Sequence, residues 1–102
     1  VLLQIADALP PGPKRVEGHT DNVPIHTAQF ATNWELSSVR ATTIARLLLD
    51  HNAADPVQLS AAGYAEFHPV ATNATEEGRA RNRRVDIILL SAPLQPHPAA
   101  SQ

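Results

Sequence analysis

Three segments with the residue pattern of β-strands alternate along this chain with three segments that have the pattern of helices. Alternating apolar and polar residues predict a strand over residues 57–63, and residues 14–20 and 85–90 also read as short strands bounded by turn residues or helices. Apolar residues at helical spacing or helix-start signals predict helices over residues 2–9, 32–52 and a short segment that begins at 75. Strands separated by helices favour helices packed on one face of a small sheet. The sequence therefore predicts an α/β (α+β) two-layer sandwich.

Turn and cap residues set the limits of these segments. The run Pro10-Pro11-Gly12-Pro13 ends the first helix, and Asp21-Asn22 ends the first strand. Thr32 followed by Glu35 has the spacing of a capping box, although Asn33 is an equally good cap by residue type. We expect one domain over residues 1–90 and a disordered tail over residues 91–102, which is rich in proline and alanine.

Composition excludes several classes of function. The net charge is −2, so a nucleic-acid partner is not expected. There are no cysteines, and the five histidines fit no short metal-ligand motif, so surface histidines and no metal or cofactor are expected. No stretch reaches the roughly 18 apolar residues that a membrane span needs. The chain opens on a structured-looking segment, so we expect it to be part of a longer protein.

One arginine lies in the apolar stripe of the long predicted helix. At about 100° per residue, Arg40 falls on the same side as the apolar residues of the helix, which are Leu36, Ala41, Ile44, Leu47 and Leu48. A guanidinium stays charged and needs an anion or several acceptors. Arg40 either reaches the rim or forms a structural ion pair, or it forms a two-charge ligand site with Asp21. Such a pair suits a zwitterion, because arginine binds a carboxylate and aspartate accepts from an ammonium.

Several short motifs, in order and at matching spacing, resemble the OmpA-like peptidoglycan-binding domain. The resemblance covers residues 2–90. It is carried by residues 18–22 (Gly-His-Thr-Asp-Asn), 33–37 (Asn-Trp-Glu-Leu-Ser) with Arg40-Ala41, 63–66 (Gly-Tyr-Ala-Glu) with Pro69, Asn73, 78–79 (Gly-Arg) and 82–85 (Asn-Arg-Arg-Val).

The resemblance implies a non-catalytic domain that binds the diaminopimelate-containing stem peptide of peptidoglycan. The ligand-binding residues that it implies are Asp21, Arg40, Asn33, Thr20, Leu36 and the weaker candidate Arg83. It implies a βαβαβ(α)β topology with a small mixed sheet, whose first strand this chain is expected to lack. The family's glycine after Gly63-Tyr64 is Ala65 here, a change not expected to affect binding.

The loop over residues 22–25 (Asn-Val-Pro-Ile) and the run over 33–37 resemble the periplasmic domains of flagellar stator B subunits. This implies a wall anchor in the periplasmic part of an inner-membrane protein of a Gram-negative bacterium. The implied partners are peptidoglycan, a second copy of the chain, and an ion-channel subunit reached through a preceding segment. The alternatives are an outer-membrane lipoprotein or porin-type anchor of the same family, and a dimerisation module.

Two other kinds of site remain open. Paired carboxylates can cleave glycans, but Asp21 beside an arginine should stay ionised, whereas a general acid needs a raised pKa. The other candidate carboxylates are Glu17, Glu66, Glu76 and Glu77. The aromatic residues Trp34, Tyr64 and Phe67 either belong to the core or form a platform on which a sugar stacks.

Overall fold

The computed structural model describes residues 9–90. The helix predicted over residues 2–9, apart from its last residue, and the tail predicted over 91–102 lie outside this range. The elements in order are β1 (Lys14–His19), α2 (Asn33–Asp50), the 3-10 turn η1 (Pro56–Gln58), β2 (Leu59–Gly63), α3 (Glu76–Asn82) and β3 (Arg84–Leu89).

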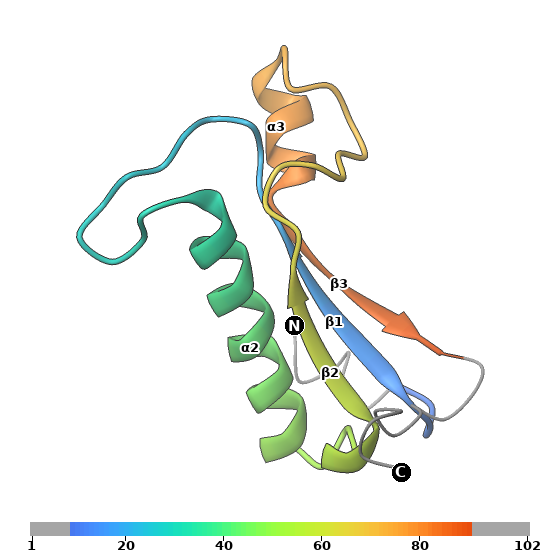
Figure 1. The fold of residues 1–102 in the computed structure, drawn as a ribbon. Coiled ribbons are helices and arrows are strands. Elements are labelled where there is room, and N and C mark those ends of the chain that lie inside the picture. The colour runs from blue at the N-terminus through green and yellow to red at the C-terminus, as the bar shows by residue number, and fades with distance from the viewer. Residues whose placement is uncertain (1–8, 91–102) are drawn as a thin grey trace, which may run out of the picture.

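The described strands form one mixed sheet in the order β2-β1-β3. The central strand β1 pairs in parallel with β2 and antiparallel with β3. The helix α2 packs along β1 and β2 (Figure 1), and the predicted two-layer α+β class is confirmed. The short helix α3 does not lie on that face, because it stands beyond the end of the sheet where β1 and β2 finish and β3 begins (Figure 1).

Small residues bring α2 close to the sheet. A Cβ atom at Gly18 of β1 would overlap the carbonyl oxygen of Ser37, and one at Gly63 of β2 would overlap the side chain of Ser38. The face of α2 that is buried consists of Asn33, Ser37, Ala41, Ala45 and Leu48. Its centre is therefore set by Ser37, Ala41 and Ala45, which allow close contact with the sheet.

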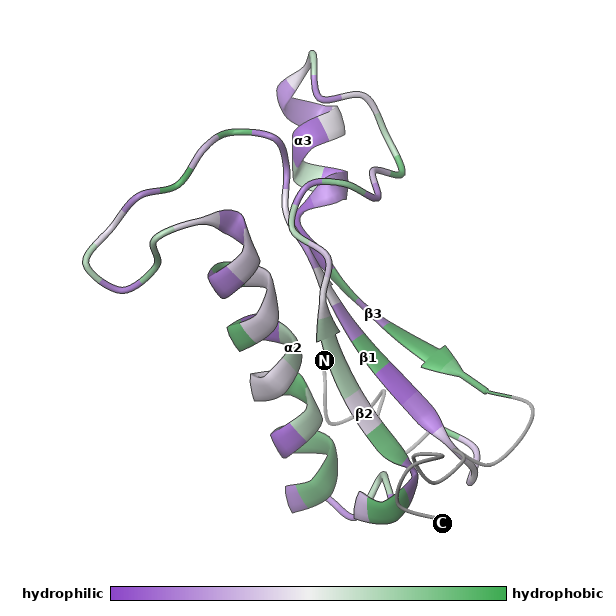
Figure 2. Ribbon diagram, in the orientation of Figure 1, coloured by the Kyte–Doolittle hydropathy of each residue, from purple (hydrophilic) through white to green (hydrophobic). Residues whose placement is uncertain are grey.

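This geometry leaves Arg40 exposed at the margin of α2, as in the alternative that it reaches the rim, and outside the buried face. The side chains of Leu36, Ile44 and Leu47 are half-buried along the margin of the helix, and Arg40 among them is exposed. The fully buried apolar residues Val16, Ala41, Ala45 and Leu48 form the core, with Ile44, Leu59, Val85 and Ile87 packed against it. Hydrophobic residues gather in the lower half of α2, in β2 and in the lower part of β3, whereas β1 and α3 are mainly hydrophilic (Figure 2).

The strand predicted from Val57 begins two residues later than expected. The carboxylate of Asp55 accepts a hydrogen bond from the backbone N–H of Val57 (3.0 Å) and caps η1. Val57 is 82% exposed, so its assignment to the buried face of a strand was wrong. Of the helices within residues 9–90, none has the length and hydropathy that crossing a bilayer requires.

Candidate functional site

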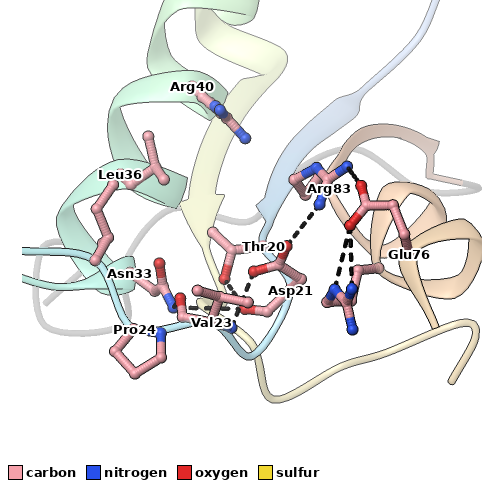
Figure 3. A pocket seen from close by; sticks show the side chains of 11 residues that line it. Thr20, Asp21, Val23, Pro24, Asn33, Leu36, Arg40, Glu76 and Arg83 are labelled. Carbon is pink, nitrogen blue, oxygen red and sulfur yellow. Dashed lines mark hydrogen bonds and ion pairs between the residues drawn. The ribbon is translucent and has the colours of Figure 1, made fainter. Parts of the chain in front are cut away.

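Three segments enclose a hollow of about 370 Å³ at the end of the sheet. They are the loop that follows β1, the first turns of α2, and α3 (Figure 3). Its lining includes all six residues predicted to hold a ligand: Thr20, Asp21, Asn33, Leu36, Arg40 and Arg83. Val23, Pro24, Ile25, Glu76 and Arg79 also line it and were not predicted. The fold thus gathers the six predicted residues, and their role toward a ligand stays a prediction.

Asp21 lies on the floor of the hollow and is only 7% exposed. One carboxylate oxygen, Oδ1, accepts from the backbone N–H of Val23 at 3.0 Å, which is the hydrogen bond of an Asx turn. The other, Oδ2, accepts from Nη1 of Arg83 at 2.7 Å. A carboxylate offers about four acceptor positions, so Asp21 retains capacity for a further donor.

Asn33 neither caps α2 nor presents a free amide to the hollow. The cap is Thr32, whose Oγ1 accepts from the backbone N–H of Trp34 at 3.1 Å. The Asn33 amide nitrogen instead donates to the backbone carbonyls of Val23 (3.1 Å) and Asp21 (3.4 Å). Asn33 therefore ties the loop after β1 to the start of α2 and helps to position Asp21.

Thr20 is held from both sides of the chain. Its hydroxyl donates to the carbonyl of Asp21 (2.8 Å), and its backbone N–H donates to the carbonyl of Ala65 (2.9 Å). Ala65 is fully buried and has a φ of 54°, a left-handed conformation that glycine adopts more readily. Ala65 thus has a conformation that suits glycine at the position where the resemblance has glycine, and its N–H donates to the hydroxyl of Ser37 (3.0 Å).

Arg40 is the cation of the hollow that has no ionic partner among residues 9–90. Its side chain extends from α2 over the hollow, toward the side where Asp21 and Arg83 lie (Figure 3). It is exposed, and no carboxylate in the described part of the chain lies within ion-pair distance of it. The structural ion pair considered for Arg40 is thus not formed among these residues, and its guanidinium is available to a ligand.

Arg83, the weaker candidate of the sequence, makes a direct ion pair with Asp21 at 2.7 Å. Its guanidinium also donates to Glu76 at 2.6 Å, and Arg79 lies 3.3 Å from the same carboxylate. The hydrogen bond and charge of Arg83 lower the pKa of Glu76 below its ordinary value, and hydrogen bonds to Glu76 and Asp21 raise the pKa of Arg83 above its ordinary value. Glu76 lies seven residues before Arg83, two helical turns away, and this spacing could have indicated the pair.

The hollow carries more positive than negative charge. Its lining contains three arginines and two carboxylates, namely Arg40, Arg79 and Arg83 against Asp21 and Glu76. Since the two carboxylates bind Arg83 and Arg79, the excess cation is Arg40. The arrangement suits a ligand that presents a carboxylate to Arg40 and a hydrogen-bond donor to Asp21.

Two neighbours of Arg83 have structural roles. Asn82 is fully buried, and its side-chain amide oxygen Oδ1 accepts from the backbone N–H groups of Val70 (2.9 Å) and Ala71 (3.0 Å). Arg84 pairs with Asp86 at 3.0 Å and donates to the carbonyl of His68 at 3.1 Å. Both residues fix the loop between β2 and α3, which holds Arg83 in place.

A second polar cluster lies on the sheet face away from α2. His19, Glu17 and Asp86 offer ligand atoms within 4.8 Å of one another, but Arg15 and Arg84 already pair with the two carboxylates. His19 is 2% exposed, so its assignment as a surface histidine was wrong. Burial would raise the pKa of Glu17, but hydrogen bonds from Arg15 and His19 outweigh it and lower that pKa below 4.5.

Comparison with known proteins places this geometry in a family. A model of the OmpA family matches residues 1–83. Motility protein B of Bacillus subtilis is 46% identical over 81 residues, which are 79% of this chain and 31% of that protein. The chain thus spans less than a third of this relative.

Solved structures agree with the sequence relatives. The cell wall anchor of the T6SS from Pseudomonas aeruginosa superposes with a TM-score of 0.81 at 47% identity, over 89% of this chain and 64% of that one. The C-terminal domain of Helicobacter pylori MotB superposes with a TM-score of 0.79 at 30% identity, over 89% of this chain and 71% of that one. With the family match over most of its length and the same fold as these two structures, the chain belongs to the OmpA family.

Proposed function

We propose that this chain binds peptidoglycan without cleaving it, by holding the diaminopimelate of the stem peptide between Asp21 and Arg40. The observation that carries this proposal is the hollow, in which an aspartate with spare acceptor capacity faces an arginine that has no ionic partner among residues 9–90. The side-chain end of diaminopimelate carries an ammonium and a carboxylate. Asp21 accepts from the ammonium, and Arg40 donates to the carboxylate.

The remaining predicted residues shape the hollow. Leu36 is half-buried on the first turns of α2 and supplies an apolar wall for the ligand's methylene groups. Asn33 and Thr20 hold the loop that carries Asp21, and Arg83 keeps the Asp21 carboxylate oriented. In this proposal Asp21 and Arg40 contact the charged groups of the ligand, and the other residues mainly position them.

The charges of the hollow support binding without catalysis. A general acid needs a raised pKa, whereas Arg83 lowers the pKa of Glu76 and also pairs with Asp21. Each of the two carboxylates that line the hollow is thus paired with an arginine, and the proposed function needs neither a cofactor nor a metal.

The proposal is tested by co-sedimentation with two kinds of purified sacculi. Diaminopimelate-type sacculi should pellet the domain, and lysine-type sacculi should bind it about 30-fold more weakly, because lysine lacks the carboxylate that Arg40 binds. Loss of one partner of such a contact costs about 2 kcal/mol or more, which is about 30-fold in affinity. Equal binding to both sacculi would exclude the role of Arg40. No binding to either would exclude the wall-binding function.

The assembly that the domain anchors is a separate part of the proposal. The likeness to two proteins called motility protein B or MotB supports a flagellar stator, with this domain in the periplasm, a dimer of the chain, and an ion-channel subunit as its membrane partner. The T6SS cell wall anchor, at 47% identity, favours an anchor for another envelope assembly as the alternative.

A chimera separates these assemblies. Motility protein B of Bacillus subtilis whose matching segment is replaced by this chain should support swimming, and the same chimera with Asp21→Asn should not. Membrane levels of both chimeras, measured by immunoblot, are the control for expression. A chimera that reaches the membrane and binds sacculi but gives no swimming would favour the alternative assembly.

A further inference from the structure

Two large aromatic side chains lie exposed beside the proposed ligand site. Trp34, in the first turn of α2, is 50% exposed, and Phe67, in the loop after β2, is 60% exposed. Their ring centroids are 5.4 Å apart with planes tilted by 30°. Tyr64, by contrast, stacks on His19 at 5.3 Å. The aromatic platform considered from the sequence therefore consists of Trp34 and Phe67, and Tyr64 does not belong to it.

The aromatic pair borders a second hollow of about 390 Å³. The walls of this hollow are mainly apolar and carry a few polar groups. The residues that line it are Pro24, Ile25, Ala31, Thr32, Asn33, Trp34, Glu66 and Phe67. Pro24, Ile25 and Asn33 also line the proposed ligand site. Because the two hollows share these three residues, a ligand bound at Asp21 and Arg40 can continue over Pro24 and Ile25 onto the aromatic pair.

The polar groups of the second hollow differ in their availability. The hydroxyl of Thr32 donates to Glu35, and the amide nitrogen of Asn33 binds the loop carbonyls. Glu66 is half-buried, and within residues 9–90 its carboxylate takes part in no ion pair or side-chain hydrogen bond. The hollow thus combines aromatic faces with one acceptor that no described residue occupies.

We propose that Trp34, Phe67 and Glu66 form a subsite for a sugar ring of the glycan strand to which the bound stem peptide is attached. A pyranose ring has an apolar face of C–H groups, which packs on aromatic rings, and hydroxyl groups at its rim, which donate to a carboxylate. The inference rests on the proposed function, since the stem peptide brings the sugar to this position. Two residues separate diaminopimelate from the sugar-linked lactyl group, and because the D-glutamate is joined through its γ-carboxyl they span more than the about 7 Å of two α-linked residues.

A second copy of the chain is the competing occupant of this surface. Stable protein interfaces bury about 800 Å² on each partner, far more than two half-exposed side chains provide. The platform is also bordered by the carboxylate of Glu66 and by Glu35 at the helix start. Its small apolar area and adjacent acceptor favour a small polyol ring over a protein surface.

The test compares two soluble ligands by isothermal titration calorimetry. One is the free tripeptide L-Ala–D-Glu–meso-diaminopimelate, and the other is the same tripeptide attached to N-acetylglucosaminyl-N-acetylmuramic acid. The parent domain should bind the sugar-linked form about tenfold more tightly, which corresponds to ~1.4 kcal/mol. Phe67→Ala and Glu66→Gln should each reduce this ratio, and Trp34→Ala with Phe67→Ala should bring it close to one. Val39→Ala, an exposed apolar change on the same helix, should leave the ratio unchanged.

The outcomes separate this inference from the proposed function. Unchanged tripeptide affinity in the variants, with loss of only the sugar-dependent gain, supports the subsite. A ratio of one in the parent, or an equal loss for both ligands in Phe67→Ala, overturns the subsite and leaves the function standing. Failure of the parent to bind either ligand overturns both. A concentration-dependent dimer that Phe67→Ala dissociates, with the ratio unchanged, assigns the surface to self-association.

Discussion

The Asp21→Asn variant is expected to lose affinity for diaminopimelate-type sacculi by about 30-fold or more, with little change in stability. Asparagine keeps an oxygen that can accept from the backbone N–H of Val23, so the Asx turn is preserved. The variant lacks the negative charge that would bind the ligand's ammonium. Truncating one partner of a buried charge pair costs about 2–5 kcal/mol of binding. The ion pair with Arg83, whose side chain is 38% exposed, contributes up to about 1 kcal/mol of stability.

Variants of Arg40 are expected to weaken sacculus binding in the same way. Arg40→Ala should lose a similar factor in binding, and its free energy of unfolding should stay within about 0.5 kcal/mol of the parent, since the side chain is exposed. Arg40→Lys should lose less, because lysine keeps the charge but not the two-pronged geometry toward a carboxylate. Arg46→Ala, an exposed arginine on the same helix, is the matched control and should bind like the parent.

Equilibrium sedimentation with sacculi gives the affinities, and urea unfolding gives the stabilities. Parent-like binding by Asp21→Asn would show that its charge does not contact the ligand, even if the wall remains the partner. If Arg40→Ala bound sacculi like the parent while Asp21→Asn were impaired, the carboxylate of the ligand would have to contact Arg79 or Arg83 instead of Arg40.

The gathering of the candidate residues could be predicted from the sequence, but their pairing could not. Asp21 after a strand and Arg40 on the next helix indicated a two-charge site, and both line one hollow. The direct partner of Asp21 is Arg83, 62 residues away in sequence. This pair depends on the antiparallel register of β1 and β3, in which His19 lies opposite Arg84. A local residue pattern does not determine the register between distant strands, so Arg83 was recognised only as a weaker candidate.

The fold class could be predicted because the alternation of strand and helix patterns is a property of whole segments. The orientation of α2 could not, because a helical wheel weighs side chains by hydrophobicity. The sheet instead selects the helix face on which Ser37, Ala41 and Ala45 allow close approach. The role of Asn33 could not be predicted for a similar reason, because its contacts with the loop carbonyls depend on how the loop after β1 folds back onto α2.

The Gly18→Ala variant is expected to lose about 3 kcal/mol or more of unfolding free energy. Gly18 is buried on the central strand, and an added Cβ would overlap the backbone carbonyl of Ser37 and come within 3.3 Å of the backbone nitrogen of Ala41. Adding atoms to a close-packed site costs about 1–3 kcal/mol, and more where the neighbour cannot move. Here the neighbours are backbone atoms inside a helix, so relief requires α2 to shift away from the sheet.

Such a shift also affects the site, because β1 leads to Asp21 and α2 carries Arg40. Urea unfolding and sacculus binding of Gly18→Ala should therefore both be impaired under conditions where the variant is folded. Ser60→Thr, which adds one methyl group at a half-buried position of β2, is the control and should change stability by no more than about 0.5 kcal/mol. If Gly18→Ala were as stable as the parent, the close approach of α2 to β1 would not hold the two halves of the site in register.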